Sequence, residues 1–163
     1  MNNILETDVN KAILEIKTFL KVQSNKCAFK GWRFYLDNDA PESFKALKEH
    51  KASKMLPIAT AGSNTSIYGT KFNTLFRFYH DVTHLKLDKG FSLEGELAVI
   101  DKHIKDIKES GLLSPLAIQI FLIDTKGQVE YYFHHKSFVK NQRTFLDTAL
   151  RYGIKRAIQY LKP

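Results

Sequence analysis

Cysteine, proline and long apolar runs are scarce in this chain of 163 residues, which has one cysteine and four prolines. The lone Cys27 has no partner for an intramolecular disulfide, which predicts a reducing compartment. No apolar run approaches the roughly 20 residues that a membrane-spanning helix needs. The chain starts with a polar and acidic segment (residues 1–8), unlike a secretory signal. These absences predict a cytoplasmic protein that does not contact a membrane.

Acidic side chains are also few. Seventeen carboxylates stand against 25 lysines and arginines, which gives a formal net charge of +8. Such a balance favours contact with nucleic acid, an anionic membrane surface or an acidic partner, and of these nucleic acid bound through a basic surface is the candidate. The alternative is a solvated lysine-rich surface that binds nothing.

The length predicts one domain over residues 1–163. Apolar residues recur at helical spacing over 8–22, 71–87, 92–110 and 141–162, and the basic segment 42–54 predicts a shorter helix. After Pro115 the period changes: two apolar runs within 116–134 flank a turn at 124–128, which predicts a hairpin. We therefore expect an α+β fold, a mainly helical single domain with a small antiparallel β-hairpin.

The segment richest in chemistry reads His80-Asp81-Val82-Thr83-His84, followed after eleven residues by Glu96. Residues four apart lie on the same face of a helix, so His80 and His84 can point at one atom. A turn at 88–90 would bring the Glu96 carboxylate back from the next helix. Two imidazoles and a carboxylate suit a divalent metal ion, zinc above all. The alternative is a polar contact between two helices without a metal.

Two further residues border this predicted site. Asp81 adjoins the histidine face and could be a fourth ligand or could orient one of the ligands. His103 shares a helix face with Glu96, because seven residues make nearly two turns, and could be a further ligand or a proton carrier. Catalytic roles are therefore predicted for His103 and Asp81.

These residues carry two resemblances to known families. The pattern HDxxH-x11-E is similar to the zinc-ligand motif of the fourth coenzyme-Q biosynthesis (Coq) protein. The residues from Phe76 to His103 resemble a domain of large polyvalent proteins from phages and plasmids, which carries FRxxHD…H…GFxxxGE…H. The second resemblance covers about thirty residues and implies a phage or mobile-element protein in its host's cytoplasm. The first implies work on an aromatic acid or quinone precursor.

Two functions of different classes remain. The first is a metal-dependent hydrolase that uses the His80, His84 and Glu96 site on a small-molecule or phosphoryl substrate. The second is a non-enzymatic accessory or counter-defence protein that binds nucleic acid or a host protein, with any metal purely structural. A closed site with four protein ligands would favour the second function, and three ligands plus water would favour the first.

Overall fold

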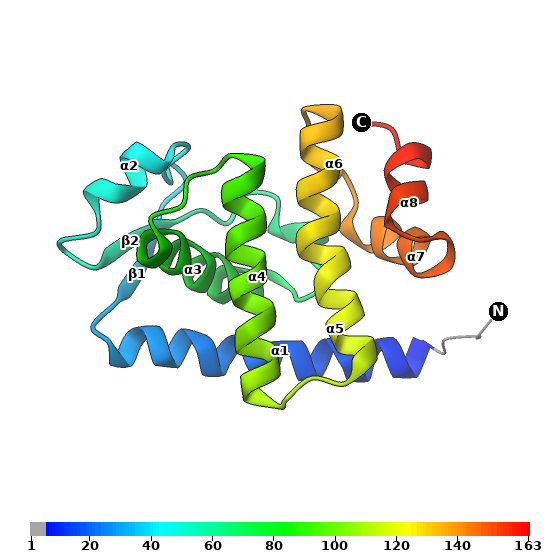
Figure 1. Ribbon diagram of the computed structural model, residues 1–163, viewed down its shortest axis with the longest axis horizontal. Helices are drawn as coiled ribbons and strands as arrows, with labels where there is room; N and C mark the ends of the chain where they lie inside the picture. Colours follow the sequence, from blue (N-terminus) through cyan, green and yellow to red (C-terminus); the bar gives the residue numbers. More distant parts are fainter. Residues whose placement is uncertain (1–5) are drawn as a thin grey trace.

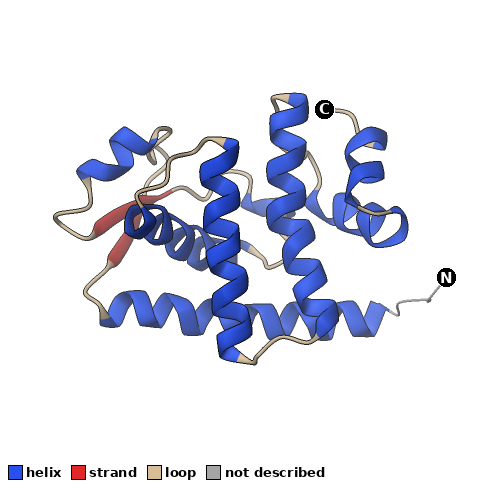
Figure 2. Ribbon diagram, in the orientation of Figure 1, coloured by secondary structure: helices blue, strands red, loops and turns tan. Residues whose placement is uncertain are grey.

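The computed structural model describes residues 6–163, so the first five residues of the acidic start lie outside it. The chain is mainly helical, with one small two-stranded sheet (Figures 1 and 2). Its elements are α1 (Glu6–Phe29), β1 (Arg33–Leu36), α2 (Phe44–Glu49), β2 (Met55–Ile58), η1 (Ser63–Thr65), α3 (Thr70–Leu87), α4 (Leu93–Ser110), α5 (Pro115–Leu122), η2 (Ile123–Gly127), α6 (Gln128–His135), α7 (Gln142–Tyr152) and α8 (Ile154–Tyr160).

Helix α1 runs along one side of the molecule and contacts both α3 and α5 (Figure 1). Helix α4 packs on α3 and also contacts α6, while α7 and α8 pack together against η2 and α6. Aromatic rings at the centre join these layers: Phe19 of α1 meets Tyr79 of α3 and Phe121 of α5, in both cases edge to face. Among the described residues, no helix combines the length and the apolar character needed to cross a membrane.

Helix α1 extends seven residues beyond its predicted end at position 22. Ser24 and Cys27 face the core, so burial carries the helix through a segment that polar composition suggests should break it. The helix ends where Gly31 adopts a positive φ of 89°. The Gly31 N–H then donates to the Ala28 carbonyl and the Trp32 N–H to the Cys27 carbonyl, the Schellman arrangement.

The predicted antiparallel hairpin at 116–134 is wrong. The sheet instead pairs β1 with β2 in parallel, from Arg33 opposite Met55 to Leu36 opposite Ile58. Residues 115–135 form a helix, continuous through α5, the π-helical turn η2 and α6. Its start carries a clear signal, because the Ser114 hydroxyl accepts the Ala117 N–H with Pro115 in the first turn.

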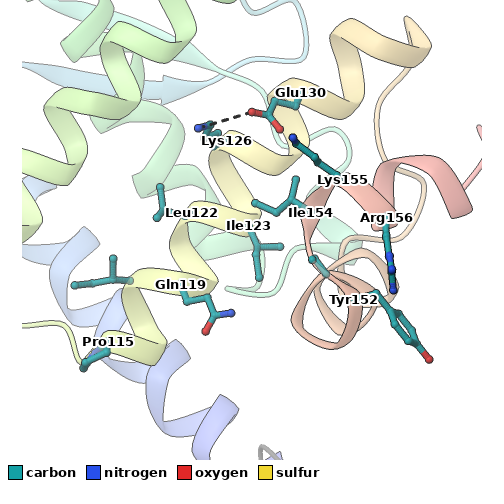
Figure 3. A pocket seen from close by; sticks show the side chains of 13 residues that line it. Pro115, Gln119, Leu122, Ile123, Lys126, Glu130, Tyr152, Ile154, Lys155 and Arg156 are labelled. Carbon is teal, nitrogen blue, oxygen red and sulfur yellow. Dashed lines mark ion pairs between the residues drawn. The ribbon is translucent and has the colours of Figure 1, made fainter. Parts of the chain in front are cut away.

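The segment Asp124-Thr125-Lys126-Gly127, predicted as a hairpin turn, is the π-helical turn η2. A Cβ on Gly127 would lie 3.0 Å from Cε1 of Phe145, so this glycine allows α7 to approach closely. The α5–α6 helix lines one wall of a groove of about 800 Å³ whose other wall is α7 and α8. Leu122, Ile123 and Ile154 line the groove, and Lys126 pairs with Glu130 (Figure 3).

The predicted C-terminal helix at 141–162 is two helices. Gly153, with φ 86° and ψ 157°, separates α7 from α8. That conformation is not helical and lies in a region that favours glycine. The break lets α8 fold back onto α7. The basic segment 42–54 also forms a helix only over Phe44–Glu49.

Ionisation of the Asp124 carboxyl group should make the free energy of unfolding depend on pH. Its carboxylate accepts a hydrogen bond from Gln128 Nε2 at 2.6 Å, but burial raises its pKa to about 6 from an ordinary 3.8. Since the folded pKa is the higher one, Asp124 favours folding most below pH 4 and loses this contribution as the pH rises through 6. By about 1.4 kcal/mol per pKa unit, ionisation costs on the order of 3 kcal/mol. We expect Asp124→Asn to be more stable than the parent at pH 7.5, with the difference shrinking towards pH 4 in urea unfolding. A difference that does not change with pH would contradict this account.

Candidate metal centre

The helix pair α3 and α4 forms as the sequence predicts, and the turn between them brings the two predicted ligand segments together. Helix α3 ends at Leu87, and the next residue, Asp88, has a positive φ of 53° that turns the chain out of the helix. Helix α4 begins after Ser92, whose hydroxyl accepts the Gly95 N–H at 3.2 Å. Glu96 therefore lies in the first turn of α4, where the helix dipole favours a carboxylate.

His80, His84 and Glu96 form a cluster in which one ligand atom from each residue lies within 4.8 Å of the others. Nε2 of His80 lies 3.0 Å from Nε2 of His84 and 3.1 Å from Oε2 of Glu96. Nε2 of His84 lies 3.5 Å from Oε1 of Glu96. This group could hold a metal ion, as the motif predicts.

The ring of His84 is fixed by a backbone acceptor. Its Nδ1 lies 2.7 Å from the carbonyl oxygen of Lys89. Because a carbonyl oxygen can only accept, Nδ1 carries a proton and donates it, and in the neutral ring Nε2 keeps its lone pair for the cluster. Backbone carbonyls commonly orient the histidine ligands of metal ions in this way. The side chain of His84 is fully buried, so its orientation is also set by packing.

His103 lies behind His80 rather than in the cluster. Its Nε2 is 3.1 Å from Nδ1 of His80, and its side chain is buried among Phe76, Tyr79 and Phe121. For His80 to offer Nε2 to a metal, its proton must sit on Nδ1 and be donated to His103. The proton of His103 then sits on its own Nδ1, which is buried and has no partner among the described residues.

Burial and neighbouring groups shift the pKa values of Glu96, His84 and His103. Burial alone would raise the pKa of Glu96, but hydrogen bonds and charge from His80 and His84 lower it to about 2. Burial lowers the pKa of His84, whereas Glu96 and the Lys89 carbonyl raise it, and the net shift is upward. Burial and the two neighbouring imidazoles hold the pKa of His103 well below its ordinary value. Glu96 is therefore an ionised carboxylate that faces two imidazoles, an arrangement that favours a cation between them, whether a proton or a metal ion.

Asp81, predicted as a fourth ligand or an orienting partner, is not one of the clustered residues. Asp81 is half-buried. Burial raises its pKa to about 6, although the charges of His80, His84 and the nearby Arg77 act to lower it. The Arg77 guanidinium itself donates to the carbonyls of Ala59 and Ala61, which attaches the preceding loop to α3. The structure thus places Asp81 within electrostatic range of the cluster and Arg77.

Two glycines shape the site: Gly90, which belongs to the predicted turn, and Gly95, whose role was not predicted. A Cβ on Gly95 would lie 1.9 Å from the carbonyl oxygen of Gly90, far inside any allowed contact. The backbones of the turn and of α4 can approach this closely only because Gly95 has no side chain. This approach positions the Lys89 carbonyl against His84 and places Glu96 across from both imidazoles. The sequence signal for this close approach is the GFxxxGE pattern, whose glycines are Gly90 and Gly95.

Aromatic rings surround the imidazoles. Phe91 lies 5.0 Å from His84 between ring centroids, Phe44 of α2 lies 6.4 Å from it, and Phe76 lies 5.4 Å from His80. These rings lower the local dielectric, which strengthens electrostatic interactions within the cluster. The side chains of His80 and Glu96 remain 17% and 15% exposed, so the cluster reaches solvent on one side.

Comparisons of this chain with protein-family models, curated proteins and solved structures find no match. The two resemblances therefore rest on the motif residues themselves. The geometry of those residues supports metal binding, and the families they resemble stay predictions.

Proposed function

We propose that this protein is a metal-dependent hydrolase whose ion, zinc, is held by His80, His84 and Glu96. The observation that carries the proposal is the mutual spacing of the donor atoms. Three ligands of a tetrahedral zinc at 2.0–2.1 Å would lie about 3.3 Å apart. Here the two imidazole Nε2 atoms lie 3.0 Å apart, Oε2 of Glu96 lies 3.1 Å from Nε2 of His80, and the other carboxylate oxygen, Oε1, lies 3.5 Å from Nε2 of His84. Two imidazoles and a carboxylate are also a donor set of catalytic zinc sites.

The number of ligands favours catalysis over a structural role. Structural zinc sites have four protein ligands, whereas catalytic ones have three and leave a position for water or substrate. The cluster here has three residues, and two of them are partly exposed. A divalent ion in this position supplies Lewis acidity, which acidifies water and polarises the carbonyl or phosphoryl oxygen of a substrate.

Neighbouring groups would fix the tautomer and orientation of the two histidine ligands. The Lys89 carbonyl fixes the tautomer of His84, and His103, as a neutral acceptor, fixes that of His80. Because His103 contacts His80 and is closed off from solvent, we assign it a positioning role in place of proton transfer. Asp81 is the half-buried acid adjacent in sequence to His80 and is the candidate for proton exchange. The resemblance to the phage and plasmid domain supports a functional role for the same residues. We therefore include an origin in a phage or another mobile element in this proposal.

Hydrolysis by zinc-loaded protein tests this function. Chromogenic p-nitrophenyl esters of acetate, phosphate and thymidine 5′-phosphate sample acyl, phosphomonoester and phosphodiester bonds. We expect one class to be cleaved, with the rate falling at least about a hundredfold in His80→Ala/His84→Ala. The control variant, His50→Ala/His134→Ala, removes two histidines outside the cluster and should retain the rate. Equal rates in parent and His80→Ala/His84→Ala for all three substrates would overturn the hydrolase.

A further inference from the structure

Phe29 is the most exposed large apolar side chain in the described part of the chain, at 93%. It is the last residue of α1, and the Schellman arrangement at Gly31 fixes the backbone directly after it. It forms no aromatic or cation–π pair within residues 6–163. A rigid helix therefore presents a phenyl ring to solvent without a partner inside the protein.

A shallow hollow of about 440 Å³ lies beside this ring on the outer face of α1. It is lined by Val22, Asn25, Lys26, Phe29 and Lys30. Lys26 and Lys30 are four residues apart, so their ammonium groups project from the same face, about one helical turn from each other. The hollow thus combines an apolar floor with two cations.

A third cation, Lys86 of α3, lies within electrostatic range of this surface without lining the hollow. Burial lowers the pKa of Lys86, the charge of Cys27 acts to raise it, and the like charges of Lys30 and Lys102 lower it further, which places Lys86 within electrostatic range of Lys30. Lys102 is paired with Asp106, whose other oxygen accepts the Tyr79 hydroxyl. Within the described residues, none of Lys26, Lys30 and Lys86 forms an ion pair. Their positive charge is uncompensated.

We propose that this surface, formed by Lys26, Phe29 and Lys30, binds single-stranded nucleic acid, with a base stacked on Phe29 and phosphates contacted by the two lysines, whose field Lys86 reinforces. Stacking on an exposed aromatic ring together with lysines that follow the backbone is how proteins bind single strands without sequence preference. The formal net charge of +8 favours the same partner. A duplex keeps its bases stacked on each other and cannot use Phe29.

An anionic membrane is the competing partner, and the surface fits it less well. A helix that lies in a membrane interface presents several apolar side chains along one face. Here Phe29 projects alone: of the other residues that line the hollow, Val22 is partly buried and the rest are polar. Phosphate contacts and one stacking platform are therefore the better description.

This surface is separate from the metal centre. Lys86 follows His84 by two residues on α3, which places the two side chains about 200° apart around the helix axis. Binding of nucleic acid can therefore be tested without metal, and its outcome is independent of the hydrolase proposal.

The test is fluorescence anisotropy with a labelled 20-nucleotide oligothymidylate, measured from 50 to 200 mM salt. We expect the parent to bind and the affinity to fall steeply as salt rises. Phe29→Ala should weaken binding about tenfold, because one base loses its stacking partner. Lys26→Ala/Lys30→Ala should weaken it further and reduce the slope of log K against log salt by about 1.4, or about 0.7 for each lost phosphate contact.

Matched controls distinguish binding at this surface from nonspecific binding through the protein's net positive charge. Phe138→Ala removes another exposed ring, at 77%, and Lys140→Ala/Lys155→Ala removes two exposed lysines elsewhere. Both controls should bind nearly as the parent does. The proposal is overturned if the parent does not bind the oligonucleotide at 50 mM salt, or if each variant at the surface behaves like its control. Phe29-dependent binding to phosphatidylserine vesicles, without binding to the oligonucleotide, would likewise overturn it in favour of a membrane.

Discussion

The parent protein, purified without an affinity tag and incubated with zinc, is expected to retain about one equivalent of the metal, and His80→Ala/His84→Ala to retain none. The variant loses two of three clustered donors and leaves Glu96 alone, and a single carboxylate does not hold zinc at micromolar concentration. Plasma mass spectrometry after gel filtration measures the ratio. Zinc should also raise the melting temperature of the parent, since a ligand bound at a hundred times its Kd stabilises the folded state by about 2.7 kcal/mol.

The control for this prediction is again His50→Ala/His134→Ala, because neither residue belongs to the cluster. It should retain the parent's zinc content and the thermal shift. Equal zinc in the parent and in His80→Ala/His84→Ala would place the metal elsewhere on the chain. No zinc in the parent would leave the cluster as a polar contact between α3 and α4, and the hydrolase proposal would fail with it.

The helix pair and the three clustered residues were predictable because their geometry is local. The spacing of His80 and His84 fixes their common face on any helix. The turn at 88–90 is short, so it brings Glu96 back to that face whatever the rest of the chain does. Only the depth of burial, which closes His84 from solvent and leaves His80 and Glu96 partly open, depends on distant residues such as Phe44.

The parts that sequence reasoning missed depend on contacts between distant segments. Residues 116–134 have β-branched side chains and a turn-like Asp124–Gly127, so local preference predicts a hairpin. Packing against α1, α4 and α7 overrides that preference. The parallel sheet pairs β1 with β2, two four-residue strands that are separated in sequence by α2. Hydrophobic periodicity in the sequence does not predict which strands pair. The position of His103 behind His80 likewise follows from how α4 packs on α3.

Gly95→Ala is expected to destabilise the protein and weaken metal binding, although alanine is normally the better helix residue by about 1 kcal/mol. The new methyl group would lie 1.9 Å from the Gly90 carbonyl oxygen and 2.8 Å from its carbon. Both are backbone atoms and cannot rotate away, so α4 and the turn must separate. Overpacking of this kind costs about 1–3 kcal/mol. We expect the free energy of unfolding in urea to fall by that amount.

The same separation acts on the metal centre through the backbone. Moving the turn withdraws the Lys89 carbonyl from His84, and moving α4 withdraws Glu96 from both imidazoles. Loss of such orienting contacts lowers metal affinity about 10- to 100-fold, which zinc competition against a chromophoric chelator would measure. Glu94→Ala, one residue away and 88% exposed, is the matched control and should bind zinc as the parent does. If Gly95→Ala matched the parent in stability and zinc affinity, the close approach of Gly90 and Gly95 would not be what positions the ligands. Reduced stability with unchanged affinity would confine its role to folding.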